Sequence, residues 1–88
     1  MEATLSSGLR ASIGLAGASL AISDYNGTTI AVHAAPEHAG FYQFAQYAVH
    51  GLCPIVSFEP GHAVGGWSDW YYVVSLDGKS IEQLNPWR

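Results

Sequence analysis

The sequence has little charge, and positive charge is the scarcest kind. Only 11% of its 88 residues are charged, with three basic side chains against seven acidic ones and a formal net charge of −4. Three scattered cations cannot neutralise many phosphates, so the composition argues against nucleic acid as a partner and against an anionic membrane surface. The acidic residues are dispersed along the chain, so the sequence has no dense acidic stripe of the kind that a DNA mimic needs.

Cysteine and long apolar runs are also lacking. Cys53 is the only cysteine, which excludes an internal disulfide framework. The apolar stretches are far shorter than the roughly 20 residues that span a bilayer, so we expect no membrane partner. Residues 11–22 are small and apolar, like the central segment of a secretion signal. The residues before them carry only Glu2 and Arg10 as charged side chains, whereas a secretion signal begins with a positively charged segment. We therefore expect one cytoplasmic domain over residues 1–88, with residues 1–8 frayed.

Apolar residues are plentiful, at 49%, and their alternation predicts strands. From Leu9 to Leu15 every second residue is apolar, which favours a strand, although a helix over residues 9–17 stays open as an alternative. Asn26-Gly27 separates two further alternating segments and predicts a hairpin with a type I′ turn. The residues of this hairpin that we expect to face the core are Leu20, Ile22, Ile30 and Val32.

The middle of the chain has a helical pattern over residues 36–50. Pro36 suits the first helical position, and Glu37 suits the positive end of the helix dipole. The apolar residues that recur at helical spacing are Phe41, Phe44, Ala45, Ala48 and Leu52.

Further strands are expected at residues 55–58, 70–76 and 80–84, with Asp77-Gly78 as the last hairpin turn. Together these elements predict an α+β domain. Its mainly antiparallel sheet has about five or six strands in the order β-β-β-α-β-β-β, with the one helix packed on one face.

Histidine and cysteine do not combine into a metal site by spacing. His38 and His50 are twelve residues apart, which along one helix is about 18 Å, so they cannot share an ion. Cys53 follows the predicted helix C-terminus, where the partial negative charge raises a thiol pKa. We expect Cys53 to be a buried hydrophobe, and we expect no metal, no cofactor and no catalytic residue.

One local resemblance covers about half of the chain. The segments GLCPIVSF, GHAV and WYYVVSLDGKSIEQLNPW resemble the second half of papain-like peptidases of the bacteriocin-processing type. The resemblance implies that His62 matches the catalytic base and that Asn85 matches its orienting partner. That family carries its nucleophile at the start of an upstream helix, whereas no cysteine precedes Cys53 here. The resemblance thus implies a non-catalytic relative.

Large aromatic side chains are concentrated in the last quarter of the chain. Residues 70–76 are apolar on both faces of the predicted strand, and one helix can cover only one face. Trp and Tyr are frequent anchors of protein interfaces, since they give a large contact area at low entropic cost. We expect a contact surface made of Trp67, Trp70, Tyr71 and Trp87, with Asp69 and Glu59 at its rim.

Three functions fit this sequence. The first is a small acidic non-enzymatic protein-binding module, such as an inhibitor, an immunity protein or a phage-encoded antagonist of host defence, with a second copy of the chain as one partner to test. The second is a small-molecule or glycan site in the loop of residues 59–69, where His62 lies near Asp69 in sequence. The third is the non-catalytic peptidase relative.

Overall fold

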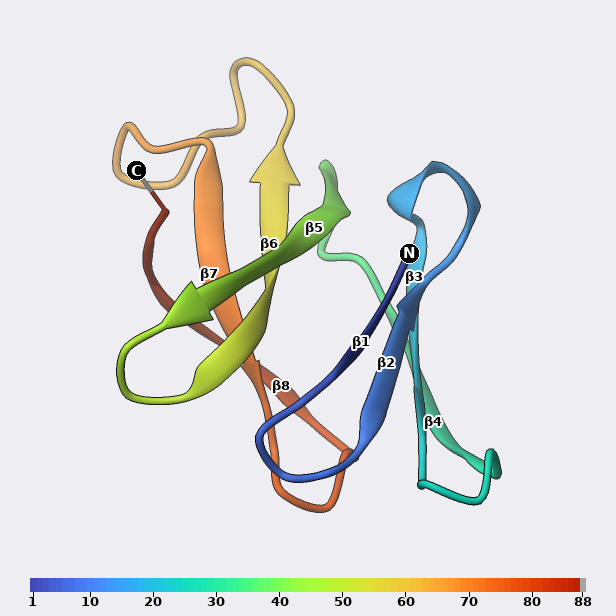
Figure 1. The fold of residues 1–88 in the computed structure, drawn as a ribbon. Coiled ribbons are helices and arrows are strands. Elements are labelled where there is room, and N and C mark those ends of the chain that lie inside the picture. The colour runs from blue at the N-terminus through green and yellow to red at the C-terminus, as the bar shows by residue number, and fades with distance from the viewer. Residues whose placement is uncertain (88) are drawn as a thin grey trace.

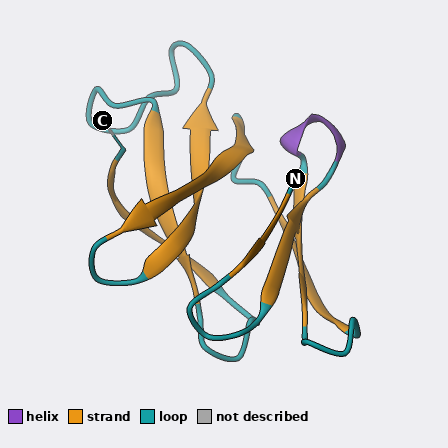
Figure 2. Cartoon of the chain, viewed as in Figure 1, coloured by secondary structure: helices purple, strands orange, loops and turns teal. Residues whose placement is uncertain are grey.

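Eight β-strands form two four-stranded antiparallel sheets, and each sheet is a simple meander (Figure 1). The structure, a computed structural model, describes residues 1–87. Sheet 1 consists of β1 (Glu2–Thr4), β2 (Arg10–Ile13), β3 (Ser19–Ser23) and β4 (Thr29–Ala34). Sheet 2 consists of β5 (Ala39–Tyr47), β6 (Gly51–Phe58), β7 (Asp69–Val74) and β8 (Ile81–Pro86). A 3-10 turn, η1 (Leu15–Gly17), connects β2 to β3 (Figure 2).

The predicted α+β class is wrong, because residues 36–50 do not form a helix. They form β5 and the turn that leads into β6. A bulge between Phe41 and Gln43 inserts one extra residue into β5. Phe41 and Phe44 therefore lie on the same buried side three residues apart. That spacing is the one that a helical stripe would show, so the bulged strand imitates a helix in the sequence.

The two predicted hairpin turns are present, but neither is a two-residue turn. In the first, the Gly27 N–H bonds to the Asp24 carbonyl oxygen at 3.0 Å, and only Gly27 has a positive φ, of 89°. The Asp24 carboxylate also accepts hydrogen bonds from the N–H groups of Asn26 and Thr28, each at 2.9 Å. This is the three-residue hairpin connection, a type I turn closed by a left-handed glycine, rather than the expected type I′ turn.

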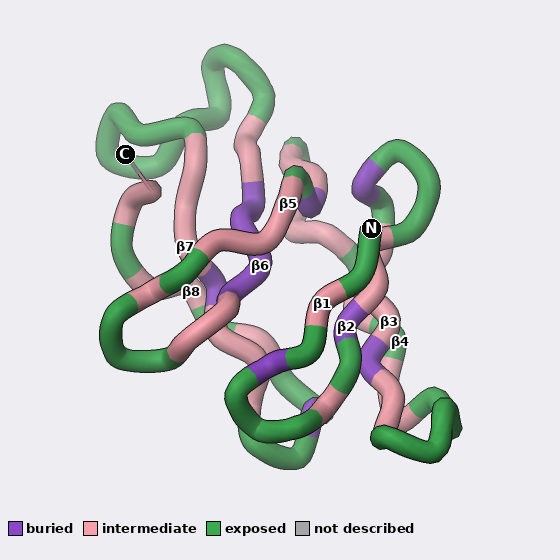
Figure 3. The backbone as a smooth tube through the Cα atoms, viewed as in Figure 1, coloured by how far each residue is buried: buried purple, intermediate pink, exposed green. Residues whose placement is uncertain are grey.

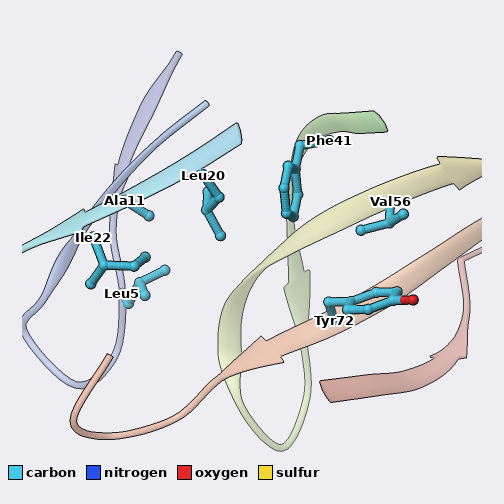
Figure 4. Close-up of a cluster of buried hydrophobic side chains, with 7 residues drawn as sticks. All are labelled: Leu5, Ala11, Leu20, Ile22, Phe41, Val56 and Tyr72. Carbon is cyan, nitrogen blue, oxygen red and sulfur yellow. The ribbon is translucent and has the colours of Figure 1, made fainter. Parts of the chain in front are cut away.

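Side chains from both sheets meet in one core (Figure 4). Sheet 1 contributes Ala11, Leu20 and Ile22, and sheet 2 contributes Phe41, Val56 and Tyr72; Leu5 joins them from the β1–β2 connection. The prediction that Leu20 and Ile22 face the core is confirmed, since both are fully buried.

The same prediction is wrong for Val32, which is 63% exposed. A register shift between Ile22 and Ser23 places Ala31 and His33, rather than Ile30 and Val32, opposite the buried residues of β3.

The N-terminal segments differ partly from expectation. Residues 2–4, expected to be frayed, pair with β2 as an edge strand. The alternating segment after Leu9 is a strand as far as Ile13, and both of these residues pack against the core. Leu15 lies beyond the strand end in η1 and is 96% exposed.

The β7–β8 turn of sheet 2 packs against sheet 1. Gly78, in this turn, is buried, and its carbonyl oxygen lies 2.8 Å from His33 Nε2 on β4. A carbonyl oxygen can only accept, so the ring nitrogen donates this bond. A Cβ at position 78 would lie 2.8 Å from Cγ2 of Ile22 and 3.1 Å from Cδ1 of Leu9. Gly78 is therefore required both by its φ of 77° and by the contact with sheet 1.

We predict that Gly78→Ala destabilises the fold more than Gly27→Ala. Both glycines have a left-handed φ, which costs an alanine about 1–2 kcal/mol. A Cβ at Gly27 meets nothing within 4 Å, whereas one at Gly78 overlaps Ile22 and should cost about 1–3 kcal/mol more. Urea denaturation of the two variants measures the difference. Equal free energies of unfolding would contradict the close packing of the turn against sheet 1.

The pH dependence of stability should report on Asp77 in the same turn. Hydrogen bonds from the Ser75 hydroxyl and then the Lys79 N–H lower the pKa of Asp77 below its ordinary value. The ionised form is thus favoured by folding, so its contribution is present above about pH 4 and is lost as the pH falls through the folded pKa. Asp77→Asn should therefore be less stable than the native chain at neutral pH, and the difference should vanish in acid. A difference independent of pH, by urea denaturation, would be inconsistent with this assignment.

Candidate functional site

Sheet 2 has a second buried layer on the side that faces away from sheet 1. Trp70 and Tyr72 point into the shared core, so Tyr71 between them points to the other face. Tyr71 lies opposite Ile55 on β6, and Cys53 follows on the same face of that strand. Both Ile55 and Cys53 are almost completely buried, although neither belongs to the core between the sheets. Other side chains of sheet 2 must therefore cover them.

Tyrosine rings provide part of this cover. The rings of Tyr47 and Tyr71 meet edge to face, with centroids 4.8 Å apart. The Tyr71 hydroxyl donates a hydrogen bond to the Gln46 carbonyl oxygen at 3.0 Å, and the Asn85 amide donates one to the Tyr47 hydroxyl at 2.7 Å. The rings are therefore held by specific polar contacts as well as by packing.

The contacts between β5 and β8 show that sheet 2 is strongly curled. These are its two edge strands, and in a flat sheet they would be about 14 Å apart. Instead Asn85 reaches Tyr47, and the rings of Tyr42 and Trp87 lie 6.0 Å apart. The curl accompanies two ring pairs, Tyr42 with Trp87 and Tyr47 with Tyr71, which come from β5, β7 and the residue after β8. We call Tyr42, Tyr47, Tyr71 and Trp87 the aromatic face.

The four predicted aromatic contact residues have different partners. Tyr71 pairs with Tyr47, and Trp87 pairs with Tyr42. Trp70 lies on the opposite side of β7, where it packs against the core between the sheets. Trp70 is therefore part of the packing between the sheets. Its indole N–H donates a hydrogen bond to the Trp67 carbonyl oxygen at 3.0 Å.

Trp67 belongs to the loop of residues 59–68, which is exposed throughout (Figure 3). Val64 and Trp67 form a small isolated bridge with reciprocal backbone hydrogen bonds of 3.0 and 2.9 Å. Gly65 and Gly66, with φ of 56° and 85°, form the tight turn between them, as a type I′ turn requires. Trp67 is 43% exposed, so this hairpin presents a large ring at a defined position.

The predicted rim residues lie at the base of this loop. Asp69 accepts a hydrogen bond from the Ser57 hydroxyl at 2.7 Å, and its carbonyl oxygen accepts the Trp87 N–H at 2.9 Å. The Glu59 N–H donates to the His38 carbonyl oxygen at 2.8 Å. The turn before β5, the loop and the end of β8 thus meet at one end of sheet 2. We call residues 36–39, 59–69 and 85–87 the loop end.

A stacked pair of histidines lies within the loop end. The rings of His38 and His62 are 3.7 Å apart and nearly parallel. Nε2 of His38 is 3.5 Å from a carboxylate oxygen of Glu37, and Nδ1 is 3.7 Å from one of Glu59. His38 also has a φ of +61°, which is unusual for a residue with a side chain. The carboxylates of Glu37 and Glu59 thus both lie close to the exposed imidazole of His38.

Sequence reasoning missed Tyr42 and Tyr47, which it assigned to a helix. Three aromatic residues within positions 41–44, with Tyr47 shortly after, are typical of a strand and were the available signal. The contact between Asn85 and Tyr47 had no such signal, because it depends on the curl of the sheet.

Neither a metal centre nor a peptidase-like pair is assembled in the described part of the chain. No three His, Cys, Asp or Glu side chains within residues 1–87 are placed to hold a metal ion. His62 stacks on His38, whereas Asn85 bonds to Tyr47, so the two residues highlighted by the peptidase resemblance have different partners. Residues 1–87 include no helix that is long and apolar enough to cross a membrane.

The two best-defined depressions lie away from the loop of residues 59–68. One, of about 310 Å³, is lined by residues of β1 to β4 and the β3–β4 turn, including Arg10 and Glu2. The other, of about 60 Å³, lies between the β1–β2 connection and residues of sheet 2. Neither depression is lined by a residue of the aromatic face. No protein-family profile, curated protein or solved structure matches the chain.

We predict that Cys53 is almost unreactive in the folded protein. It is 1% exposed, and burial raises the pKa of its thiol, so both access and thiolate formation are disfavoured. Reaction with a disulfide reagent at neutral pH should be at least about a hundredfold slower than in the urea-unfolded chain, because exposure requires an opening that costs several kcal/mol. Comparable rates in the two states would show that the second buried layer, which contains Cys53 and Ile55, is open to solvent in the folded protein.

Proposed function

We propose that the protein is a small acidic binding module, without catalytic activity, that contacts another protein through the aromatic face. The observation that carries this proposal is the two ring pairs of the aromatic face, Tyr42 with Trp87 and Tyr47 with Tyr71. Interface hot spots are enriched in such residues, particularly where rigid neighbours hold them. On this proposal the protein acts in the cytoplasm, either as an inhibitor or as an immunity-type protein.

The rigidity of this surface supports binding to a preformed partner site. Hydrogen bonds hold the side chains of Tyr47 and Tyr71, and Tyr71 lies opposite the buried Ile55 in the β6–β7 pair. A ring that is already ordered loses little side-chain entropy when it is buried by a partner. Tyr42 and Trp87 form the other ring pair of the aromatic face, and Tyr42 is 56% exposed.

The shape of the surface favours a protein over a small molecule. Small ligands are usually enclosed in a pocket, whereas protein interfaces are broad and fairly flat. Neither well-defined depression is lined by the aromatic face or by the loop of residues 59–68. The buried Cys53, with its raised thiol pKa, also lacks the setting of an activated nucleophile.

The test compares Tyr42→Ala with Tyr25→Ala, two exposed tyrosines at different places. Tyr25 is 85% exposed in the β3–β4 turn and lies outside the aromatic face. A partner is first identified by co-purification from the native host, and its dissociation constant is then measured by calorimetry. Tyr42→Ala and Trp87→Ala should each weaken binding by about 2 kcal/mol, and Tyr25→Ala should leave it unchanged.

Two controls make the result decisive. Far-ultraviolet circular dichroism and urea denaturation should show that Tyr42→Ala and Trp87→Ala are folded. Sedimentation at several concentrations should show whether the partner is a second copy of the chain. If folded Tyr42→Ala and Trp87→Ala bind every identified partner as tightly as Tyr25→Ala does, the aromatic face is not the contact surface.

A further inference from the structure

The edge strands of the two sheets differ in how they are protected from pairing with a further strand. The edges are β1 and β4 in sheet 1, and β5 and β8 in sheet 2. Native edge strands are usually short, charged, bulged or interrupted by proline, because their free N–H and C=O groups otherwise form a template for another strand. β1 has only three residues, and one of them, Glu2, forms an ion pair with Arg10 at 2.9 Å. This edge is therefore protected.

Both edges of sheet 2 are protected as well. A bulge interrupts β5 between Phe41 and Gln43. β8 contains Glu82 and Pro86, and proline has no N–H with which to continue a ladder. The curl of the sheet also brings these two edges into contact with each other.

β4 is unprotected along most of its length. Residues 25–35 include no Asp, Glu, Lys, Arg or Pro. The one irregularity in its pairing with β3 is at Ile30, near the start of the strand, and the register is regular from Ala31 to Ala34. Val32, within this regular part, is 63% exposed. β4 is thus an uncharged edge of sheet 1 (Figure 1).

The ladder between β3 and β4 shows which backbone groups face this open edge. The Ala35 N–H, just after β4, bonds to the Ala18 carbonyl oxygen at 3.0 Å. Because an antiparallel ladder alternates, His33 also bonds to β3, whereas the N–H and C=O groups of Val32 and Ala34 point away from it. Within residues 1–87, no other segment forms a hydrogen bond with these outward groups.

We propose that β4 pairs with β4 of a second copy of the chain, antiparallel and about a two-fold axis next to His33. In this register Val32 of each copy lies opposite Ala34 of the other, and each of these two pairs exchanges both of its N–H···O bonds. A register centred on Ala34 would instead place Val32 opposite Pro36, which has no N–H. A register centred on Val32 would use the irregular Ile30.

The lack of charge on β4 favours a second copy as the occupant. In a two-fold pair a charged side chain lies near its own counterpart, and like charges across a strand pair are destabilising. β4 has no Asp, Glu, Lys or Arg, so its pairing with itself meets no such repulsion. Pairing also places Ala34 of one copy beside the exposed Val32 side chain of the other.

The size of the contact predicts a weak dimer. β4 has six residues and is about 20 Å long, so this pairing buries less than the roughly 1,600 Å² of a standard protein interface. Self-association should therefore depend on protein concentration. The proposal is independent of the proposed function, because β4 contributes no residue to the aromatic face.

The experiment is sedimentation equilibrium of the full chain over a series of concentrations, with Val32→Lys and Val49→Lys as matched variants. Both valines are exposed, by 63% and 76%, and Val49 lies in the β5–β6 turn. The two substitutions change the net charge equally. We expect the native chain to dimerise and Val32→Lys to raise the dissociation constant at least about tenfold, because lysine on an edge opposes strand pairing. Val49→Lys should change it less than about twofold.

Hydrogen exchange, followed by nuclear magnetic resonance, tests the register without any substitution. The amides of Val32 and Ala34 should exchange rapidly in dilute solution and more slowly as the concentration rises. The amide of His33, which bonds to β3 within one copy, should show no such dependence. Circular dichroism and urea denaturation should show that Val32→Lys is folded.

Three results would overturn the proposal. The first is a chain that stays monomeric up to its solubility limit, including one whose Val32 and Ala34 amides are protected only by a different protein. The second is a dimer that Val32→Lys and Val49→Lys weaken equally. The third is a dimer that Tyr42→Ala removes and Val32→Lys leaves intact, which would place the second copy on the aromatic face.

Discussion

The packing of the two sheets against each other is the constraint on which the rest of the structure depends. Each sheet is a four-stranded meander with one apolar face, and an isolated sheet of this size would leave that face in water. The shared core of Leu20, Ile22, Phe41 and Val56 removes both faces from water at once. The β7–β8 turn adds a polar contact, since the buried Gly78 carbonyl oxygen accepts a bond from His33. Gly17 of η1 also approaches the Phe41 backbone so closely that a Cβ would overlap it.

Because the cores of small domains bury limited area, this chain gains from its second buried layer. Cys53 and Ile55 are almost completely buried although they lie outside the core between the sheets, on the face of the curled sheet 2 that also carries Tyr71. The curl has a local cause, since bulges interrupt β5 near Phe41 and the β7–β8 pair near Trp70. Bulges increase the twist of a strand pair. The same distortion therefore stabilises the fold and assembles the aromatic face.

The two ends of sheet 2 have different surroundings. The β7–β8 turn is bound to sheet 1, and its glycine admits no side chain. The loop end combines rings, carboxylates and the stacked pair of His38 and His62. Its first segment, residues 36–39, links β4 of sheet 1 to β5, and Ala39 packs against the shared core.

The sequence by itself determined the local elements whose signals are short-range. The strand at residues 70–76, the return strand after Asp77-Gly78 and the hairpin around Asn26-Gly27 follow from β-propensity and turn residues, and the burial of Leu20 and Ile22 follows from alternation. The burial of Cys53 was also correctly predicted, although the predicted helix before it is a strand.

Only the tertiary structure decided which residues face which side, because a bulge reverses the alternation beyond it and leaves no clear mark in the sequence. For this reason Phe41 and Phe44 imitate a helical stripe, and Val32 faces water where Ala31 and His33 face the core. The separation of Trp70 from Trp87, and the joining of Tyr42 and Tyr47 to Tyr71, depend on the curl of the whole sheet. The bulges in β5 and in the β7–β8 pair contribute to that curl, and their positions could not be predicted from the sequence.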